Sequence, residues 1–327
     1  MQFRTTFKIE KPPFPFHHQS SFFSVGSCFA QTIAQKLTYY KCSVLANPFG
    51  TLFNPISIVR VFSLLGKQEN LWQEGFLKNP EQIYYHYDFH SELKSTKLGD
   101  LQGLIHQKIT DTQHFLTDCQ VIIITLGTAW VYEHLQSGRV VANCHKMPQN
   151  LFQKRLLSVE EILENFEKII TYLKNKQIIL TLSPVRHTKD TLPLNAVSKS
   201  VLRLACHYLS QKYENIFYFP SFELLNDDLR DYRFYAEDLI HPNAQAENYI
   251  WEHFAETFFE QETLYLFSIW DKIDKQYKHK PFNPHSEAHL QFLHRLKENL
   301  LKLSEKMNVS KEIEEVEQSI LYLQKNI

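Results

Sequence analysis

The residues best suited to chemistry are two adjacent nucleophiles, Ser27 and Cys28, which follow Gly26. They stand where an apolar segment, residues 22–25, gives way to a helical pattern that begins near Phe29. A glycine lets the chain bend sharply, and the start of a helix offers unpaired backbone N–H groups and a partial positive charge. A hydroxyl or thiol placed there can attack a carbonyl while the N–H groups hold the oxyanion. The competing interpretation is a tight strand-to-helix turn with a buried cysteine.

A histidine late in the chain has the setting of a general base. His241 lies just ahead of a helical pattern that starts at Pro242, and Asp238 precedes it by three residues. An imidazole can take the proton of a nucleophile while a carboxylate holds its tautomer and orientation. The Asp-x-x-His spacing arises often by chance. Its place after the last predicted strand is where a doubly wound hydrolase needs its base.

Apolar segments rich in β-branched residues alternate with helical patterns along the chain. This alternation predicts an α/β fold: a doubly wound parallel sheet with helices on both faces, in three layers. Three of the eight glycines, Gly26, Gly50 and Gly127, follow predicted strand ends, where open α/β sheets build their active sites. The predicted strands cover residues 22–25, 43–46, 121–126, 178–182 and 216–219, and the helices between them cover 30–40, 158–173 and 196–213.

Two regions lie outside this alternation. Residues from about 55 to 115 form an insertion after the second strand that is longer than a crossover needs. The insertion is either a substrate lid or padding that covers the sheet. The character changes again near residue 263, and after a break at 281–284 two charged amphipathic helices follow, over about 286–306 and 310–324. Leucines that include Leu293 and Leu300 lie at helical spacing in the first of them. We therefore expect an α/β domain over 1–262 and a helical appendage over 263–327, either a hairpin packed on the domain or a dimerising coiled coil.

Composition excludes several classes of function. A formal net charge of −1 gives no electrostatic case for binding nucleic acid or an anionic membrane surface. No apolar run approaches the ~18 residues that span a bilayer, and the N-terminus lacks the layout of a signal peptide. Five scattered cysteines favour a reduced compartment, so we expect a soluble, cytoplasmic protein. Motifs for zinc, dinucleotides and phosphate loops are missing, and we expect no metal and no cofactor.

The sequence resembles the GSCFA family, which is named for the motif read here over residues 26–30, and by the order of its blocks it also resembles the SGNH/GDSL hydrolase superfamily. Further segments between about residues 20 and 255 resemble GSCFA proteins. They are Asn47-Pro48-Phe49-Gly50-Thr51 with Asn54-Pro55, Asp88-Phe89-His90-Ser91, Thr125-Leu126-Gly127-Thr128, Asn143-Cys144-His145-Lys146, Ser183-Pro184-Val185-Arg186-His187 and residues 231–238.

The superfamily resemblance implies a flavodoxin-like sheet of SGNH type and assigns roles to matching positions. Gly26 matches the first block, Asp238 and His241 match the last, and Gly50 falls where the superfamily places an oxyanion-hole glycine. Gly127 and Thr128 fall in the third block, which here lacks the asparagine of the superfamily. The oxyanion donor must then come from Thr128, a backbone N–H, Asn47 or Asn143.

The first block also departs from the superfamily, because it reads Gly-Ser-Cys in place of Gly-Asp-Ser. The register puts Cys28 at the nucleophile position, and Ser27 stays open as the alternative. A helix start and a neighbouring histidine should lower the pKa of a thiol, which favours Cys28.

Other polar residues have two interpretations each. Asn143, His145 and Lys146 either line the pocket or form a structural loop after a short hairpin. Arg186 either binds an anionic group of the substrate or pairs with Glu237 or Asp238.

The favoured function is hydrolysis or transfer of small acyl esters through a Cys/Ser-His-Asp site. By analogy with the superfamily, the substrate would be a small molecule or a glycan carrying an O-acetyl group. The alternative is a non-catalytic ligand-binding protein that retains the fold. A third interpretation is a scaffold acting through the C-terminal helices, through which we also consider a homodimer.

Overall fold

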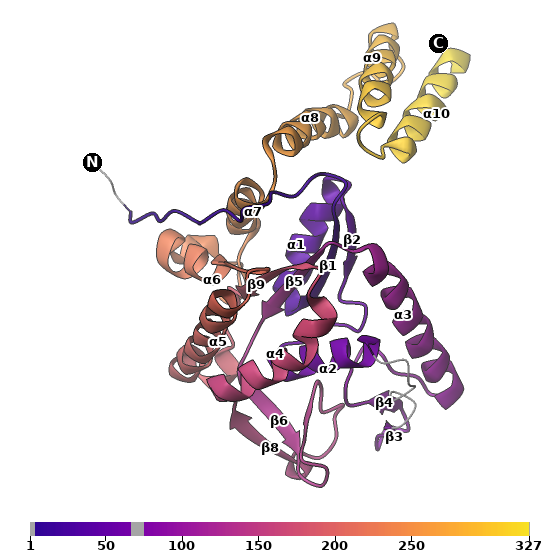
Figure 1. The fold of residues 1–327 in the computed structure, drawn as a ribbon. Coiled ribbons are helices and arrows are strands. Elements are labelled where there is room, and N and C mark those ends of the chain that lie inside the picture. The colour runs from indigo at the N-terminus through magenta and orange to yellow at the C-terminus, as the bar shows by residue number, and fades with distance from the viewer. Residues whose placement is uncertain (1–3, 67–74, 327) are drawn as a thin grey trace.

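A five-stranded parallel sheet lies at the centre of the computed structural model, which describes residues 4–66 and 75–326 (Figure 1). The strand order is β10-β9-β5-β1-β2. This is the doubly wound order, in which strands are added first on one side of β1 and then, from β5 on, on its other side. Every residue of β5 is buried, as expected for a strand covered on both faces. The strands are β1 (Ser21–Gly26), β2 (Ser43–Ala46), β5 (Val121–Leu126), β9 (Gln177–Leu182) and β10 (Ile216–Phe219). The predicted α/β class is confirmed.

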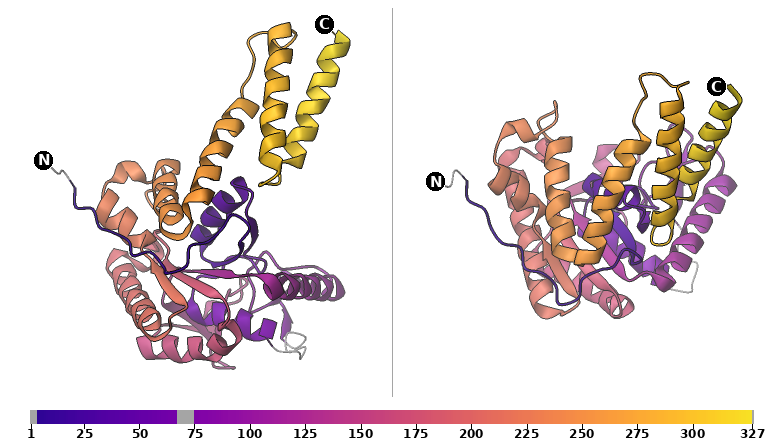
Figure 2. Two further views of the ribbon diagram at one scale, coloured as in Figure 1. Left: turned by 45° about the horizontal axis from the view of Figure 1, so that its top comes forward. Right: turned by 90° about the horizontal axis from the view of Figure 1, so that it is seen from above.

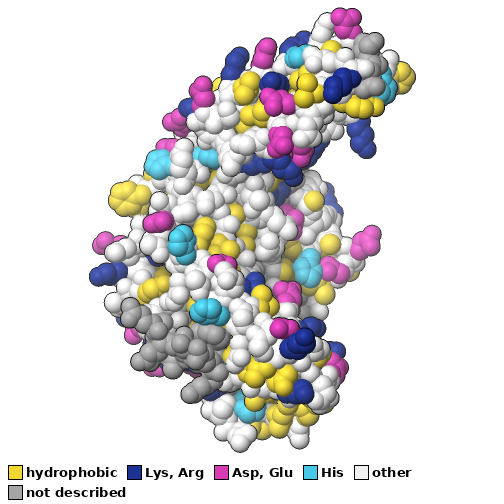
Figure 3. Space-filling model, turned by 90° about the vertical axis from the view of Figure 1, so that its right-hand side faces the viewer, with side chains coloured by type: hydrophobic (Ala, Val, Ile, Leu, Met, Phe, Trp, Pro, Cys, Tyr) yellow, Lys and Arg dark blue, Asp and Glu magenta, His cyan; other side chains and the backbone are white. Residues whose placement is uncertain are grey.

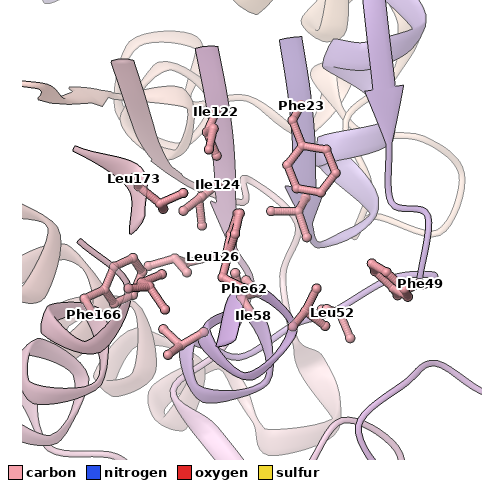
Figure 4. Close-up of a cluster of buried hydrophobic side chains, with 14 of the residues drawn as sticks. Phe23, Phe49, Leu52, Ile58, Phe62, Ile122, Ile124, Leu126, Phe166 and Leu173 are labelled. Atoms are coloured by element: carbon pink, nitrogen blue, oxygen red, sulfur yellow. The ribbon is translucent and has the colours of Figure 1, made fainter. Parts of the chain in front are cut away.

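Helices cover both faces of this sheet, because alternate side chains of each strand point in opposite directions. Ile122 and Ile124 of β5 pack among side chains of α2 and α4 on one face, as Figure 4 shows. Val121 and Ile123 pack against α1 and α7 on the other face. The helices of these layers are α1 (Cys28–Tyr39), α2 (Pro55–Gly66), α3 (Leu98–Asp118), α4 (Val159–Leu173), α5 (Leu192–Lys212), the short α6 (Ser221–Glu223) and α7 (Ala244–Phe258).

The insertion after β2 contributes to the core. It contains α2, the two-stranded sheet of β3 (Phe76–Lys78) and β4 (Tyr84–His86), and α3; residues 67–74 lie outside the described residues. Phe62 of α2 and Ile105 of α3 are buried in the same cluster as the sheet. The described part of the insertion therefore pads one face of the sheet, the second of the two interpretations.

A second, antiparallel sheet follows β5 and was predicted only as a short hairpin. Its order is β7-β6-β8, with β6 (Trp130–His134), β7 (Arg139–Val141) and β8 (Phe152–Leu156). Buried Asp88 joins this sheet to the insertion, since its carboxylate pairs with Arg60 at 3.1 Å and with Arg139 at 3.1 Å. Asp88 of the Asp-Phe-His segment thus anchors the insertion.

The chain ends in three helices that project from the α/β body (Figures 1 and 2). They are α8 (Gln261–Tyr277), α9 (Glu287–Ser304) and α10 (Ser310–Asn326), and they share a separate apolar cluster that includes Trp270 and Leu300. The end of α1 holds them: the Tyr39 hydroxyl donates to Asp271 and Asp274, both at 3.0 Å. The sequence predicted two of these helices and missed α8.

Charged side chains, free cysteines and the lengths of the helices can all be compared with the composition of the chain. Figure 3 shows basic and acidic side chains interspersed over the body and the C-terminal helices. All five cysteines are free. Within residues 4–66 and 75–326, no helix combines the length and the apolar character that crossing a bilayer requires.

Candidate active site

The turn between β1 and α1 has room only for glycine at Gly26. Its φ is +138°, and a Cβ there would lie 2.1 Å from the Thr125 carbonyl oxygen on the neighbouring strand. The same oxygen accepts the N–H of Ser27 at 3.0 Å, and the Asn47 side-chain oxygen accepts the N–H of Gly26 at 2.9 Å. These contacts hold the start of α1 at the carboxyl edge of the sheet.

The structure separates the two adjacent nucleophiles. Ser27 is fully buried, and its Oγ has no hydrogen-bond partner among the described residues. Cys28 is partly exposed, and its Sγ lies 3.7 Å from Nε2 of His241. Of the two side chains, the thiol therefore faces the histidine.

His241 is held on its other side by Asp238. The Nδ1 atom lies 2.6 Å from Asp238 Oδ2, while Oδ1 accepts the N–H groups of Ile240 and His241 at 2.9 and 3.0 Å. These backbone bonds and the imidazole lower the pKa of Asp238 to about 2. An ionised Asp238 accepts a hydrogen bond from Nδ1–H, which leaves Nε2 without a hydrogen as the acceptor that faces Cys28.

The thiol of Cys28 has a raised pKa, which corrects the prediction of a lowered one. Burial is the largest cause, and it outweighs the backbone N–H groups of Phe29 and Cys28 and the positive charge of Lys199, all of which lower the pKa. The N–H groups at the helix start thus lower the pKa of Cys28 as expected, but burial raises it by more. The resting thiol is neutral, so attack requires a base.

Three predicted oxyanion donors are already occupied. The N–H of Gly50 donates to the Asn47 carbonyl oxygen at 2.8 Å. The N–H groups of Gly127 and Thr128 both donate to the Phe53 carbonyl oxygen, at 2.8 and 3.0 Å. The Thr128 hydroxyl lies 3.1 Å from Ser198 Oγ. In this conformation none of these N–H groups is available to an oxyanion, contrary to the roles that the sequence suggested for Gly50 and Gly127. The Thr128 hydroxyl can be either donor or acceptor in its contact with Ser198.

Asn47 is the remaining candidate from the sequence beside this turn. Its Oδ1 is the atom that accepts the Gly26 N–H, so its Nδ2 carries two hydrogens that have no acceptor among the described residues. Asn47 has a φ of +42°, a conformation that asparagine tolerates better than most residues. Its side-chain amide therefore has spare donors beside Gly26, which precedes Cys28 by two residues.

The Asn143–Lys146 segment forms a structural loop around a buried histidine. The His145 ring lies 3.0 Å from the His86 carbonyl oxygen through Nε2 and stacks on Tyr85, with ring centroids 4.4 Å apart. Burial lowers the pKa of His145 to about 4. The Asn143 side chain accepts the backbone N–H of His145 at 2.8 Å. These contacts occupy both side chains and support the structural interpretation over pocket lining.

Arg186 lies beside the loop that carries His241. Its backbone N–H donates to the Ile240 carbonyl oxygen at 3.4 Å. Its guanidinium stands over the rings of Tyr235 and Tyr232, 4.3 and 5.1 Å from their centroids. No ion pair joins Arg186 to Glu237 or Asp238 within the part of the chain that the structure describes. The guanidinium thus stacks on aromatic rings, and binding of an anionic group stays a prediction.

Lys199 was missed from the sequence, and His187 was named only as part of a motif. Lys199 on α5 is only 2% exposed and donates to the carbonyl oxygens of Gly127 and Ser183. His187 has a buried Nε2 without a partner among the described residues, and burial lowers its pKa to about 4. A lysine in a helix normally suggests a solvated face. The available signal was its spacing from Leu202 and Cys206, which places it on the apolar stripe.

A metal site is not formed in the described ranges, where no three His, Cys, Asp or Glu side chains are grouped to hold an ion. The histidines near the site lie instead against carbonyl, carboxylate or aromatic groups.

Comparisons with known proteins match two family models. Residues 21–254 match the model of the GSCFA family, and residues 270–321 match that of the GSCFA domain protein, C-terminal domain. No curated protein matches the sequence significantly. A solved structure described as "a putative platelet activating factor" from Streptococcus pneumonia aligns with a TM-score of 0.38 and 10% identity, over 74% of this chain and 85% of that one.

Proposed function

The chain belongs to the GSCFA family, and from that premise we propose that it hydrolyses or transfers the acyl groups of esters through Cys28, with an SGNH-type arrangement. The observation that supports this most is the sequence of contacts from Cys28 Sγ to His241 Nε2, at 3.7 Å, and from His241 Nδ1 to Asp238, at 2.6 Å. Nucleophile, base and orienting carboxylate in this order are the parts that acyl transfer needs.

The reaction proceeds through a thioester. His241 Nε2 takes the proton of the Cys28 thiol as the sulfur attacks the carbonyl carbon of the ester. The C–O bond then breaks, His241 returns the proton to the leaving alcohol, and the acyl group stays on sulfur. Water, or an acceptor hydroxyl, attacks the thioester with His241 again as base, which releases the acid or the new ester and restores the thiol.

The oxyanion of each tetrahedral intermediate needs donors near Cys28. Backbone N–H groups at the start of α1 favour negative charge on the sulfur already. The Asn47 amide has two unpartnered hydrogens beside the same turn. We assign the oxyanion to these groups in place of Gly50, Gly127 and Thr128, whose N–H groups have internal acceptors.

The substrate class follows from analogy with the SGNH superfamily alone. We propose a small acyl ester, with an O-acetyl group on a sugar or glycoconjugate as the first candidate. Panels of acetyl, butyryl and longer-chain esters would rank the acyl group, and acetylated sugars would test the alcohol.

Alanine variants of the two nucleophiles test the proposal directly. With p-nitrophenyl acetate, Cys28→Ala should lower kcat by about 10³-fold or more, because the covalent step is lost. Ser27→Ala is the matched control and should retain most of the activity, since its hydroxyl is buried away from solvent. An acetyl group on the peptide that contains Cys28, trapped by acid quench, would support the thioester. Equal turnover in the wild type and Cys28→Ala would contradict the proposal.

A non-catalytic ligand-binding role is favoured by one observation. The three N–H groups expected at the oxyanion hole all donate to backbone carbonyl oxygens of the chain itself. If this role holds, the wild-type chain binds an ester and releases it unchanged, and no thioester accumulates. Calorimetry together with analysis of the recovered ligand separates the two functions.

A further inference from the structure

Lys199 places a buried amine at the same edge of the sheet as Cys28. Its Nζ donates to the carbonyl oxygens of Gly127, at 2.8 Å, and Ser183, at 2.7 Å. These residues directly follow β5 and β9, and β5 is paired with the strand that ends in Gly26. The amine is thus fixed between two neighbouring strand ends, close to the turn that carries the nucleophile.

Among the described residues, this amine has no carboxylate to balance its charge. Within residues 4–66 and 75–326, no Asp or Glu lies within ion-pair distance of Lys199, although a buried ammonium normally requires such a partner. Arg203 lies one turn further along α5 and forms an ion pair with Glu223 at 3.0 Å. The Glu223 carboxylate is therefore already paired with the charge of Arg203. With Lys199 this ion pair lines a cavity of about 670 Å³ between α5 and α6.

The electrostatic neighbours of Lys199 belong to the candidate site. Burial is the main cause that lowers the pKa of Lys199, and the charge of a Cys28 thiolate acts in the opposite direction and favours the ammonium. The charge of Lys199 in turn lowers the pKa of both Cys28 and His187. The negative charge that the ammonium encounters is therefore the one that forms on Cys28 during the reaction.

We propose that Lys199 is a positioning residue that serves as the buried counter-ion of the Cys28 thiolate. The thiol proton passes to Nε2 of His241, where Asp238 balances the imidazolium, and Lys199 keeps its own proton. The charge of the protonated amine, held in place by the Gly127 and Ser183 carbonyl oxygens, lowers the free energy of the sulfur anion without contact with the substrate. This inference rests on Cys28 being the nucleophile in the proposed function.

The pH profile of Cys28 alkylation tests this role without ester turnover. Iodoacetamide reacts with the thiolate, and peptide mass spectrometry reports its rate at Cys28 as the pH is raised. Lys199→Gln and Lys199→Met should both raise the apparent pKa of Cys28 by about one unit, which slows alkylation at pH 7 by about tenfold. An unchanged profile in folded variants would overturn the proposal.

A second lysine provides the control for a merely structural role. Lys176 also donates to two backbone carbonyl oxygens, those of Leu116 at 2.6 Å and Cys119 at 2.7 Å, next to the amino end of β9. Lys176→Gln removes the same kind of bonds from the opposite edge of the sheet. It should leave the alkylation profile of Cys28 unchanged; an equal shift in both lysine variants would mean that Lys199 acts only through stability.

A reciprocal measurement keeps the test valid if the Lys199 variants do not fold. Coupling between two titrating groups is mutual, so the thiolate must also affect the lysine. Nuclear magnetic resonance of side-chain-labelled lysine should show a lower pKa for Lys199 in Cys28→Ser than in the wild type. Identical titrations would contradict the proposal. A chain that passes these tests but hydrolyses no ester would contradict only the proposed function.

Discussion

At the scale of the residue, Asn47 carries two separable tasks. Its Oδ1 accepts the Gly26 N–H at 2.9 Å and so holds the turn, whereas its Nδ2 is assigned to the oxyanion. Asn47→Asp keeps an acceptor for Gly26 and removes the amide donor. We expect kcat to fall by about 10²–10³-fold with little change in the thermal unfolding midpoint. Wild-type kcat in Asn47→Asp would remove Asn47 from the oxyanion hole.

His145 makes stability depend on pH. Its pKa is about 4 in the folded chain, whereas an unperturbed histidine, as in the unfolded chain, has a pKa of 6.5. The unfolded chain therefore binds the proton first as the pH falls. The stabilisation is complete above pH 6.5 and is lost as the pH falls towards 4. The shift of about 2.5 units corresponds to about 3 kcal/mol. His187 acts in the same direction, and its pKa is also about 4.

Urea unfolding at neutral and acidic pH measures this effect. His145→Asn removes the titrating group at a position where φ is +49°, which asparagine tolerates. The loss of stability between pH 7 and 4.5 should be smaller in His145→Asn than in the wild type. His207→Gln, at an exposed position, is the control and should retain the wild-type slope. The same slope in all three proteins would contradict the assignment.

The sequence placed the main candidate residues but not their surroundings. Gly26, Cys28, Asp238 and His241 have spacings and positions next to predicted elements that local patterns reveal. The occupied N–H groups of Gly50 and Gly127 depend on contacts with distant carbonyl groups, which no local pattern encodes. Which of Ser27 and Cys28 faces His241 depends on the direction of each side chain, which the sequence does not show. Lys199 was missed because lysine is normally solvated, and its burial follows from the packing of α5.

At the scale of the element, the β1–α1 turn depends on a missing Cβ. Gly26→Ala would bring a methyl group to 2.1 Å from the Thr125 carbonyl oxygen, at a φ of +138°. The strand or the turn must then move, and we expect a loss of about 3 kcal/mol or more in unfolding free energy. Gly103→Ala is the control, because nothing lies within 4 Å of its Cβ inside α3 and alanine favours a helix by about 1 kcal/mol. Equal unfolding midpoints for the two variants would refute this account.

Elements with a strong local signal were predicted best. The strand predicted over 121–126 matches β5, because a continuous apolar run needs burial on both faces. The helix predicted over 158–173 matches α4, because Ser158 caps it: the Ser158 side chain accepts the N–H of Glu161. Pro242 precedes the cap of α7, which is Asn243, so the start predicted at Pro242 was two residues too early. The strand β8 has a mixed sequence and forms by pairing with β6, which local propensity does not report.

At the scale of the whole molecule, a homodimer through the C-terminal helices stays a prediction. The leucines that favoured a coiled coil, among them Leu293 and Leu300, are buried within the chain against α8 and α10. A dimer would therefore use the outer face, where Leu301 and Leu321 are exposed. Leu301→Asp with Leu321→Asp should convert a dimer to a monomer in sedimentation, while Leu104→Asp on α3 should not. Unchanged sedimentation would exclude this face.

The helix α1 joins two parts of the molecule, with Cys28 at its first residue and Tyr39 at its last. Its twelve residues span about 18 Å, and each added residue would advance one end by about 1.5 Å and rotate it by about 100°. A single insertion would thus turn either the thiol away from His241 or the Tyr39 hydroxyl away from Asp271 and Asp274. The length of α1 is fixed from both ends, so its side chains tolerate substitution far better than the helix tolerates a change in residue count.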